Sequence, residues 1–434
     1  MKFSFQTFLI GLFIVAFIGA ILIFSGVIKV GKSSNSGVVT RVTVWGTYPQ
    51  SIVVPYTEKL STQDKTLSIS YTEKSSTTFK NDLINALANG APPDLVLIDA
   101  NNLFSFRDKL YVIPYATYNE RLYRDSYVDG ASLFLNKEGV MAVPLLVDPL
   151  VVYYNKDLLA GQNYVVPPSS WSGLVASLPK FIKKDQRGAI TASAIGLGEF
   201  ANVNHYKDIL SALFLQTGAP IVTLNTNTGL YEQKLSTSSE DGQSLPAADA
   251  LNFYLGFSNQ ATDRFSWSRT LPSTLDMFLS GKSAFYIGRA SELFTIQSRN
   301  PNLNFDVTTF FQPDDAIRPI TFGAYSGAGI IKSSPNFTAS YTALGYLTSK
   351  EFVQYLSGTT ALPSARRDLL LTSQQNPYVQ VFFKAALSAF GWPDVDQNAT
   401  ETVFRDMIRT VNSGANTPTQ AIYEASRNLQ SIVR

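Results

Sequence analysis

Cysteine is absent from this 434-residue chain, and histidine occurs only once, at His205. The missing cysteine excludes disulfide bonds, thiolate metal sites, a cysteine nucleophile and a lipid-modified cysteine at the start of a mature protein. A single histidine excludes histidine-rich metal sites and catalysis by two histidines. The chain also lacks any Lys/Arg-rich run, and its net charge is only +2. We therefore expect no nucleic-acid partner.

Apolar and aromatic residues are plentiful by contrast. Hydrophobic residues make up 45% of the chain and charged residues 16%, with 21 Tyr, 29 Phe and 4 Trp. This composition is typical of a globular protein with a substantial core. The length allows about two or three domains, and the aromatic residues are numerous enough to line a pocket as well as fill a core.

The first long apolar run, Phe8 to Ile28, contains no charged residue. A helix of that length rises about 30 Å and can cross the hydrocarbon core of a bilayer. No convincing cleavage site follows, so we expect residues 1–30 to form one uncleaved transmembrane signal-anchor; a cleaved signal is the alternative. Residues 31–39 are rich in Gly and Ser and should form a flexible tether.

Strand and helix patterns alternate after the tether and predict an α/β fold. Short β-branched or apolar runs predict strands at Arg41 to Trp45, Leu67 to Tyr71 and Leu95 to Asp99. Helical spacing predicts helices at Ser51 to Leu60 and Phe79 to Ala88 between them.

Farther along, Val140 to Asn155 is interpreted as two strands joined by Asp148-Pro149. Tyr206 to Leu215 and Thr274 to Leu279 have helical spacing, and the chain is almost wholly helical from Ala339 onward. The polar residues 223–245 predict a surface excursion or hairpin.

Three local patterns suggest chemistry, and each has a simpler interpretation. Gly196 to Ala201 matches G-x-G-x-x-A, but no acidic residue in a clear strand context follows at the spacing of a dinucleotide site. Gly323 to Gly327 places its serine one position away from a hydrolase elbow. Asp394 to Asn398 begins like a calcium loop, but Ala399 and Arg405 break the pattern, and a polar turn that starts a helix is favoured. His205 is either a satisfied polar residue or a ligand contact.

An ordered set of longer motifs resembles the extracellular solute-binding protein family 1, the ABC transporter substrate-binding proteins that include maltodextrin-binding protein. The motifs span about residues 40 to 430, and Gly173 and Phe285 depart from residues common in the family. The matching stretches are RVTVWG, NGAPPDLVLID, VPLLVDPLVVYYNKDLL followed by PPSSWSGLVASL, and LDMFLSGKSAFYIG.

The resemblance implies a two-lobed periplasmic-binding-protein fold of type II-like topology, with discontinuous lobes joined by hinge strands. We expect one lobe from 40–147 plus 272–325 and the other from 148–271 plus 326–434. Crossings are expected near Leu145 to Val151, Phe265 to Leu271 and Thr321 to Ile330. The lobes would close around a ligand by hinge motion, outside the cytoplasm, and the closed protein would be recognised by the ABC permease.

The resemblance also places ligand-binding candidates at the cleft. They lie after the first strand, at the end of the third, at the lobe crossing and at later element ends: Trp45, Thr47, Tyr48, Asp99, Asn101, Asp148, His205, Tyr206, Arg289, Tyr325 and Trp392. We expect no catalytic residue, metal or cofactor. The expected ligand is a mono- or oligosaccharide, because rings stack on sugar faces and Asp and Asn bond hydroxyls. A glycan-binding or sensor module without transport, an extracytoplasmic glycoside hydrolase, and solutes other than sugars remain alternatives.

Overall fold

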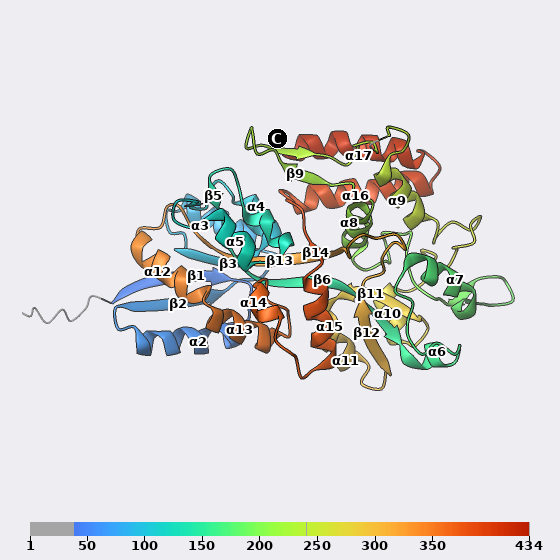
Figure 1. Ribbon diagram of the computed structural model, residues 1–434, viewed down its shortest axis with the longest axis horizontal. Helices are drawn as coiled ribbons and strands as arrows, with labels where there is room; N and C mark the ends of the chain where they lie inside the picture. Colours follow the sequence, from blue (N-terminus) through green and yellow to red (C-terminus); the bar gives the residue numbers. More distant parts are fainter. Residues whose placement is uncertain (1–38, 240, 434) are drawn as a thin grey trace, which may run out of the picture.

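The computed structural model describes residues 39–239 and 241–433 (Figure 1). The predicted membrane anchor, Phe8 to Ile28, lies outside the described residues, as does all of the tether except Val39. Within the described ranges, no helix has both the length and the apolar character needed to cross a bilayer. The anchor therefore stays a prediction from the sequence.

A mixed eight-stranded sheet lies at the centre of the fold. Its strands are ordered β11-β6-β13-β3-β1-β2, with β12 beside β6 and β14 beside β13. Strands β1, β2 and β3 are parallel, and β13 runs antiparallel to β3 and β6. The predicted first three strands are confirmed. The strands of this sheet are β1 (Thr40–Gly46), β2 (Leu67–Glu73), β3 (Leu95–Asp99), β6 (Val143–Asn155), β11 (Phe285–Arg289), β12 (Phe305–Thr309), β13 (Thr321–Ile330) and β14 (Ala389–Phe390).

Strand β6 corrects one prediction. The Asp148-Pro149 pair does not separate two strands, because β6 is continuous over 13 residues. Its first part, up to Pro149, pairs with β13, and from Leu150 it pairs with β11 and β12. Proline has no backbone N–H to donate to a neighbouring strand. At Pro149 the strand changes partners, so the missing donor is tolerated there.

Helices cover both faces of the sheet (Figure 1); the 3₁₀ turn η1 (Asp129–Phe134) follows α5, and the 3₁₀ turn η2 (Ala290–Glu292) leads from β11 into α11. The helical interpretation of the chain after Ala339 is confirmed. The helices are α2 (Gln50–Gln63), α3 (Phe79–Ala88), α4 (Ala100–Ser105), α5 (Glu120–Ser126), α6 (Lys156–Ala160), α7 (Trp171–Phe181), α8 (Tyr206–Gln216), α9 (Pro246–Leu255), α10 (Thr274–Leu279), α11 (Leu293–Arg299), α12 (Phe337–Leu347), α13 (Lys350–Thr360), α14 (Arg367–Leu370), α15 (Pro377–Ala386), α16 (Gln397–Asn412) and α17 (Pro418–Val433).

The polar stretch 223–245 contains the predicted hairpin. Strands β9 (Val222–Leu224) and β10 (Tyr231–Gln233) pair antiparallel, and β10 packs against α17. Two further small strand pairs complete the fold: β4 (Ile113–Pro114) with β5 (Gly139–Val140), and β7 (Lys183–Lys184) with β8 (Ile190–Ala192).

Two lobes, the first containing β1, β2 and β3 and the second containing β11 and β12, share the long strands β6 and β13, which run from one lobe into the other (Figure 1). The segments are grouped differently from the predicted division. Helix α10 and strands β11 and β12, within 272–325, pack with the second part of β6. Helices α12 and α13, within 326–434, pack against β1, β13 and α2 in the first lobe.

The segment 265–271 also differs from its predicted role as a crossing. Trp267 is fully buried, and its Nε1 donates to Asn202 at 3.0 Å. Ser193 donates to the carbonyl of Ser266 at 2.7 Å. These partners all belong to the second lobe, so the segment lies inside that lobe. The other two predicted crossings, Leu145 to Val151 and Thr321 to Ile330, lie within β6 and β13.

Candidate functional site

A cavity of about 320 Å³ lies where α4 of the first lobe approaches the second lobe. Asn101, near the start of α4, is its contribution from the first lobe. The cavity also has aromatic walls, formed by Phe200, Tyr206, Phe322 and Trp392. Its remaining polar lining comes from α8, β11 and the start of α16 with the preceding loop: His205, Lys207, Asp208, Arg289, Asp394, Gln397 and Glu401.

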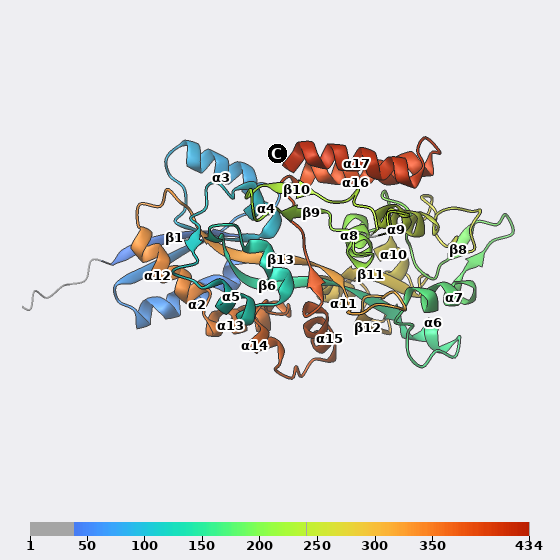
Figure 2. The same cartoon turned by 45° about the horizontal axis from the view of Figure 1, so that its top comes forward.

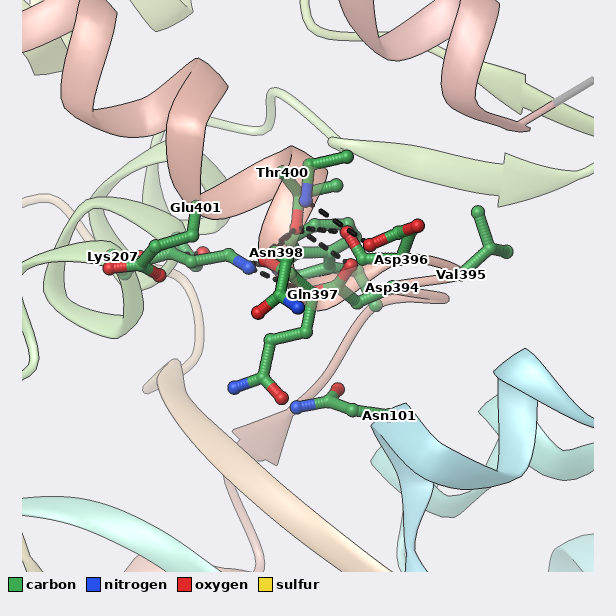
Figure 3. Close-up of polar contacts among 12 residues, drawn as sticks. Asn101, Lys207, Asp394, Val395, Asp396, Gln397, Asn398, Thr400 and Glu401 are labelled. Carbon is green, nitrogen blue, oxygen red and sulfur yellow. Dashed lines mark hydrogen bonds and ion pairs between the residues drawn. The ribbon is translucent and has the colours of Figure 1, made fainter. Parts of the chain in front are cut away.

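Five of the residues predicted from the sequence meet in this cavity: Asn101, His205, Tyr206, Arg289 and Trp392. They come from positions as far apart as 101 and 392, so only the fold brings them together. Asn101 lies opposite the start of α16. Figure 3 shows the amides of Asn101 and Gln397 directed toward each other.

His205 occupies the turn before α8, in the left-handed region at φ 58°. Its Nε2 lies 3.0 Å from Oε2 of Glu292, and its Nδ1 lies 3.7 Å from Oδ2 of Asp208. A left-handed conformation is costly for a non-glycine residue and persists where surrounding contacts hold it. The two carboxylates supply such contacts, so His205 is held in place on the cavity wall.

Glu292 is oriented by several donors. Its Oε2 accepts hydrogen bonds from the backbone N–H of Arg289 at 2.9 Å and from the hydroxyl of Tyr286 at 2.9 Å. Burial opposes ionisation of Glu292, but the hydrogen bond with His205 and these donors outweigh it, and its pKa is lowered. Glu292 is therefore a fixed anion behind His205.

Arg289, at the end of β11, is bonded to Asp208 of α8. Its Nε and Nη2 donate to Oδ2 at 2.9 and 2.6 Å. Burial opposes the charge on Arg289, but Asp208 and Asp148 outweigh it and raise its pKa. Asp148 itself is partly buried and accepts a bond from the backbone N–H of Ser291 at 3.0 Å. Burial raises the pKa of Asp148, although Arg289 partly offsets this.

Lys207 and Asp394 form a second ion pair on the wall, at 2.6 Å between Nζ and Oδ2. Thr400 accepts from Lys207 at 2.7 Å and donates to Oδ1 of Asp394 at 2.8 Å (Figure 3). Four residues of the lining were not among those predicted from the sequence: Lys207, Asp208, Gln397 and Glu401. The sequence did draw attention to Asp394, because the acidic stretch that starts there begins like a calcium loop. Its partner Lys207 on α8 is 187 positions away, so no local pattern connects the two residues.

Trp392 is only 6% exposed, so most of its ring is covered. Phe404 stacks on it with centroids 6.0 Å apart and an interplanar angle of 8°. Its Nε1 donates to Ser211 of α8 at 3.1 Å. The ring is thus fixed in one orientation, and only a small part of it faces the cavity.

The other predicted residues lie outside the cavity lining. Tyr48 bonds Ser326 at 2.6 Å, next to Asp99, whose β3 position pairs with Ser326 in β13. Asp99 caps α4 by accepting from the N–H of Asn102 at 2.9 Å. Burial raises the pKa of Tyr48 well above its ordinary range, with Asp99 and Asp148 adding to the shift.

Trp45, Thr47 and Tyr325 have local partners of their own. The ring of Trp45 lies under Nζ of Lys74 at 4.0 Å, and the N–H of Thr47 donates to the carbonyl of Leu97 at 3.3 Å. Tyr325 is 2% exposed, and its hydroxyl donates to the carbonyl of Ala389 at 2.7 Å. Burial inside the core keeps this side chain from facing the cavity.

Helix α4 also touches the second lobe beyond Asn101. Ser105 donates to the carbonyl of Val395 at 3.3 Å. The ring of Phe104 meets Tyr231 of β10 edge-on, with centroids 5.9 Å apart, and Lys137 donates to the carbonyl of Asn227 at 2.9 Å. Figures 1 and 2 both place the hairpin between the first lobe and α17. The hairpin thus joins the lobes beside the cavity.

The three chemical patterns of the sequence have structural roles here. A Cβ on Gly196 would lie 2.3 Å from Thr274, and Gly198 has φ +89° beside Ser258, so both glycines serve packing. Ser326 lies within β13, not at a strand-to-helix elbow. Asp396 caps α16 as the polar turn predicted, and no cluster of His, Asp and Glu suited to a metal ion occurs among the described residues.

Comparisons with known proteins agree with this architecture. The sequence profile of the bacterial extracellular solute-binding proteins matches residues 55–361. A cyclo/maltodextrin-binding protein complexed with maltotetraose has a TM-score of 0.73 and 17% identity over 90% of this chain and 96% of its own. The sugar-binding protein MalE from Xanthomonas citri has a TM-score of 0.71 and 18% identity, covering 91% and 97%. The cyclic alpha-maltosyl-1,6-maltose binding protein from Arthrobacter globiformis has 0.71 and 15%, covering 91% and 99%. At such identities, these likenesses establish a shared two-lobed fold.

Proposed function

Because the chain belongs to the bacterial extracellular solute-binding protein family, we propose that it captures a carbohydrate between its lobes and delivers it to an ABC-type permease. The observation that carries the proposal is the cavity of about 320 Å³ with ring walls and hydrogen-bonding groups from both lobes. Apolar ring faces stack on sugars, and amides, carboxylates and cations bond hydroxyls. Structural neighbours that bind maltotetraose and other sugars give independent support.

The proposed capture uses hinge motion about β6 and β13. A ligand that contacts Asn101 on one side and α8 or α16 on the other stabilises the conformation in which these elements lie close together. The permease then binds that conformation. The apolar run Phe8 to Ile28 would hold the protein at the outer face of the cell membrane, with the two-lobed part outside.

The test is a thermal-shift screen of the full chain against mono- and oligosaccharides, with amino acids, peptides and polyamines for comparison. The detergent, where one is needed, must lack a sugar headgroup. A sugar at about 100 times its dissociation constant should add about 2.7 kcal/mol of stability. Chromatography of the recovered sugar should show it unchanged; released monosaccharide would identify a glycoside hydrolase instead. A shift with another solute, and with no sugar, would overturn the choice of carbohydrate.

A further inference from the structure

Each cation on the cavity wall is bonded to a carboxylate of its own. Nζ of Lys207 lies 2.6 Å from Oδ2 of Asp394, and Nη2 of Arg289 lies 2.6 Å from Oδ2 of Asp208. An ion pair this close leaves little net charge to attract an anion from outside. The wall therefore offers strong hydrogen-bonding groups whose charges are already compensated.

The Lys207–Asp394 pair is the more deeply buried of the two. Lys207 is 8% exposed and Asp394 is 4% exposed. An ammonium group has three N–H donors, and bonds to Asp394 and Thr400 use two of them (Figure 3). Both oxygens of Asp394 accept bonds, one from Lys207 and one from Thr400. Since Lys207 lines the cavity, its third donor is available for an oxygen atom of a bound molecule.

Glu401 adds a negative charge to the same wall. Among the residues that the structure describes, no cationic group lies within 4.0 Å of its carboxylate. Apart from His205, the lining holds three carboxylates (Asp208, Asp394 and Glu401) and two cations (Lys207 and Arg289). A ligand carboxylate placed here would face Asp394 and Glu401, and like charges brought together without water oppose binding.

We propose that Asp394 is a specificity-determining residue: by compensating Lys207, it makes the cavity select an uncharged polyhydroxyl ligand over its acidic counterpart. This inference rests on the proposed function and specifies the ligand class. Without Asp394, the ammonium of Lys207 would face the cavity with its charge unopposed and would pair with a sugar carboxylate. With Asp394, the same ammonium donates a hydrogen bond to a hydroxyl without attracting anions.

The test compares matched sugars that differ by one carboxylate: glucose with glucuronate, galactose with galacturonate, and mannose with mannuronate. Calorimetric titration of the full chain should show the neutral member of each bound pair binding at least about tenfold more tightly, which corresponds to about 1.4 kcal/mol. Asp394→Asn should lower that ratio about tenfold by uncovering Lys207. The matched control is Asp396→Asn, which removes the same charge two residues away; asparagine still caps α16, so the ratio should stay within about twofold.

A measurement on the wild type decides the matter if Asp394→Asn fails to fold. Raising the salt concentration from 50 to 500 mM screens the part of the repulsion that acts through solvent as the ligand approaches, so it should narrow, without abolishing, the difference in affinity between the neutral and acidic sugars. Tighter binding of the acidic members, an unchanged ratio in a folded Asp394→Asn protein, or a salt-independent gap would each overturn this inference and leave sugar capture standing. Binding of none of the six sugars or of any oligosaccharide would overturn sugar capture as well.

Discussion

Arg289 and Asp208 join the end of β11 to the first turn of α8 through two hydrogen bonds to one carboxylate oxygen, at 2.9 and 2.6 Å. The side chain of Asp208 is 12% exposed and that of Arg289 is 29% exposed. The pair therefore lies at the edge of the cavity, where it fixes the guanidinium and the start of α8 relative to each other.

Replacing Asp208 by Asn should destabilise the protein by about 1.5–3 kcal/mol, because the charged hydrogen bonds to Arg289 are lost and the guanidinium stays partly buried. Urea denaturation measures the change in the free energy of unfolding. Asp125→Asn is the matched control, since Asp125 lies 3.8 Å from Arg121 on an exposed surface. Its effect should stay below about 1 kcal/mol. Equal effects of the two substitutions would contradict a structural role for the Arg289–Asp208 pair.

A pair of glycine substitutions tests the packing role of the G-x-G-x-x-A segment. Gly196→Ala should cost about 1–3 kcal/mol, since the added methyl would lie 2.3 Å from Thr274 and 2.8 Å from the ring of Trp267. Gly345→Ala, on an exposed face of α12 with open space around it, should stabilise the protein by about 0.5–1 kcal/mol. Thermal denaturation of both variants measures these changes in stability. A dinucleotide-induced shift in the melting temperature of the wild type would contradict this interpretation.

Much of the fold follows from local patterns in the sequence. The apolar residues of β1, β2, β3 and α8 follow strand or helix spacing within each segment, so each element can be predicted from its own residues. The grouping of the later segments does not follow from local pattern, because strands β11 and β12 choose β6 as partner only through long-range packing. Asp148-Pro149 has the local signature of a turn, yet the change of partner strands at Pro149 lets β6 continue.

The loss of folding stability at acidic pH should depend in part on Glu292. Its pKa is lower in the folded protein than in the unfolded chain, so the folded state binds fewer protons. The stabilisation from Glu292 is thus complete above about pH 4.3, the ordinary value for glutamate, and is lost as the pH falls through the lower folded pKa.

Glu292→Gln should therefore be less stable than the wild type near neutral pH, and the difference should shrink as the pH falls below about 4. Urea denaturation at intervals from pH 3 to pH 7 measures this. A difference that stays constant or grows toward low pH would show that hydrogen bonding of His205 and Tyr286 to Glu292 does not depend on its charge.

Tyr231 tests whether the hairpin helps to hold the lobes together around a sugar. Tyr231→Ala removes the edge-on contact with Phe104, and an aromatic pair of this kind contributes about 0.5–1.5 kcal/mol. Sugar affinity should fall by up to about tenfold, although Tyr231 does not line the cavity. Tyr231→Phe keeps the ring and should bind like the wild type. Equal losses in both variants would contradict a role for ring packing.

The candidate site was only partly accessible from the sequence. Asn101, His205, Tyr206, Arg289 and Trp392 follow from motif positions, and the cavity contains all five. Lys207 has no local signal, because a lysine on a helix is usually solvated; its role depends on Asp394, which is 187 positions away. Tyr325 shows the opposite case, since its position on β13 suggested the cleft while its side chain packs into the core.

The most direct test of sugar capture between the lobes is the distance between them. Because the chain has no cysteine, Thr77→Cys on the first lobe and Thr402→Cys on α16 give two unique, exposed sites for spin labels. Pulsed dipolar spectroscopy should show that the sugar with the largest thermal shift narrows the distance distribution and favours its short end, while an amino acid at equal concentration leaves it unchanged. A distribution that no sugar in the panel alters would contradict capture by lobe closure.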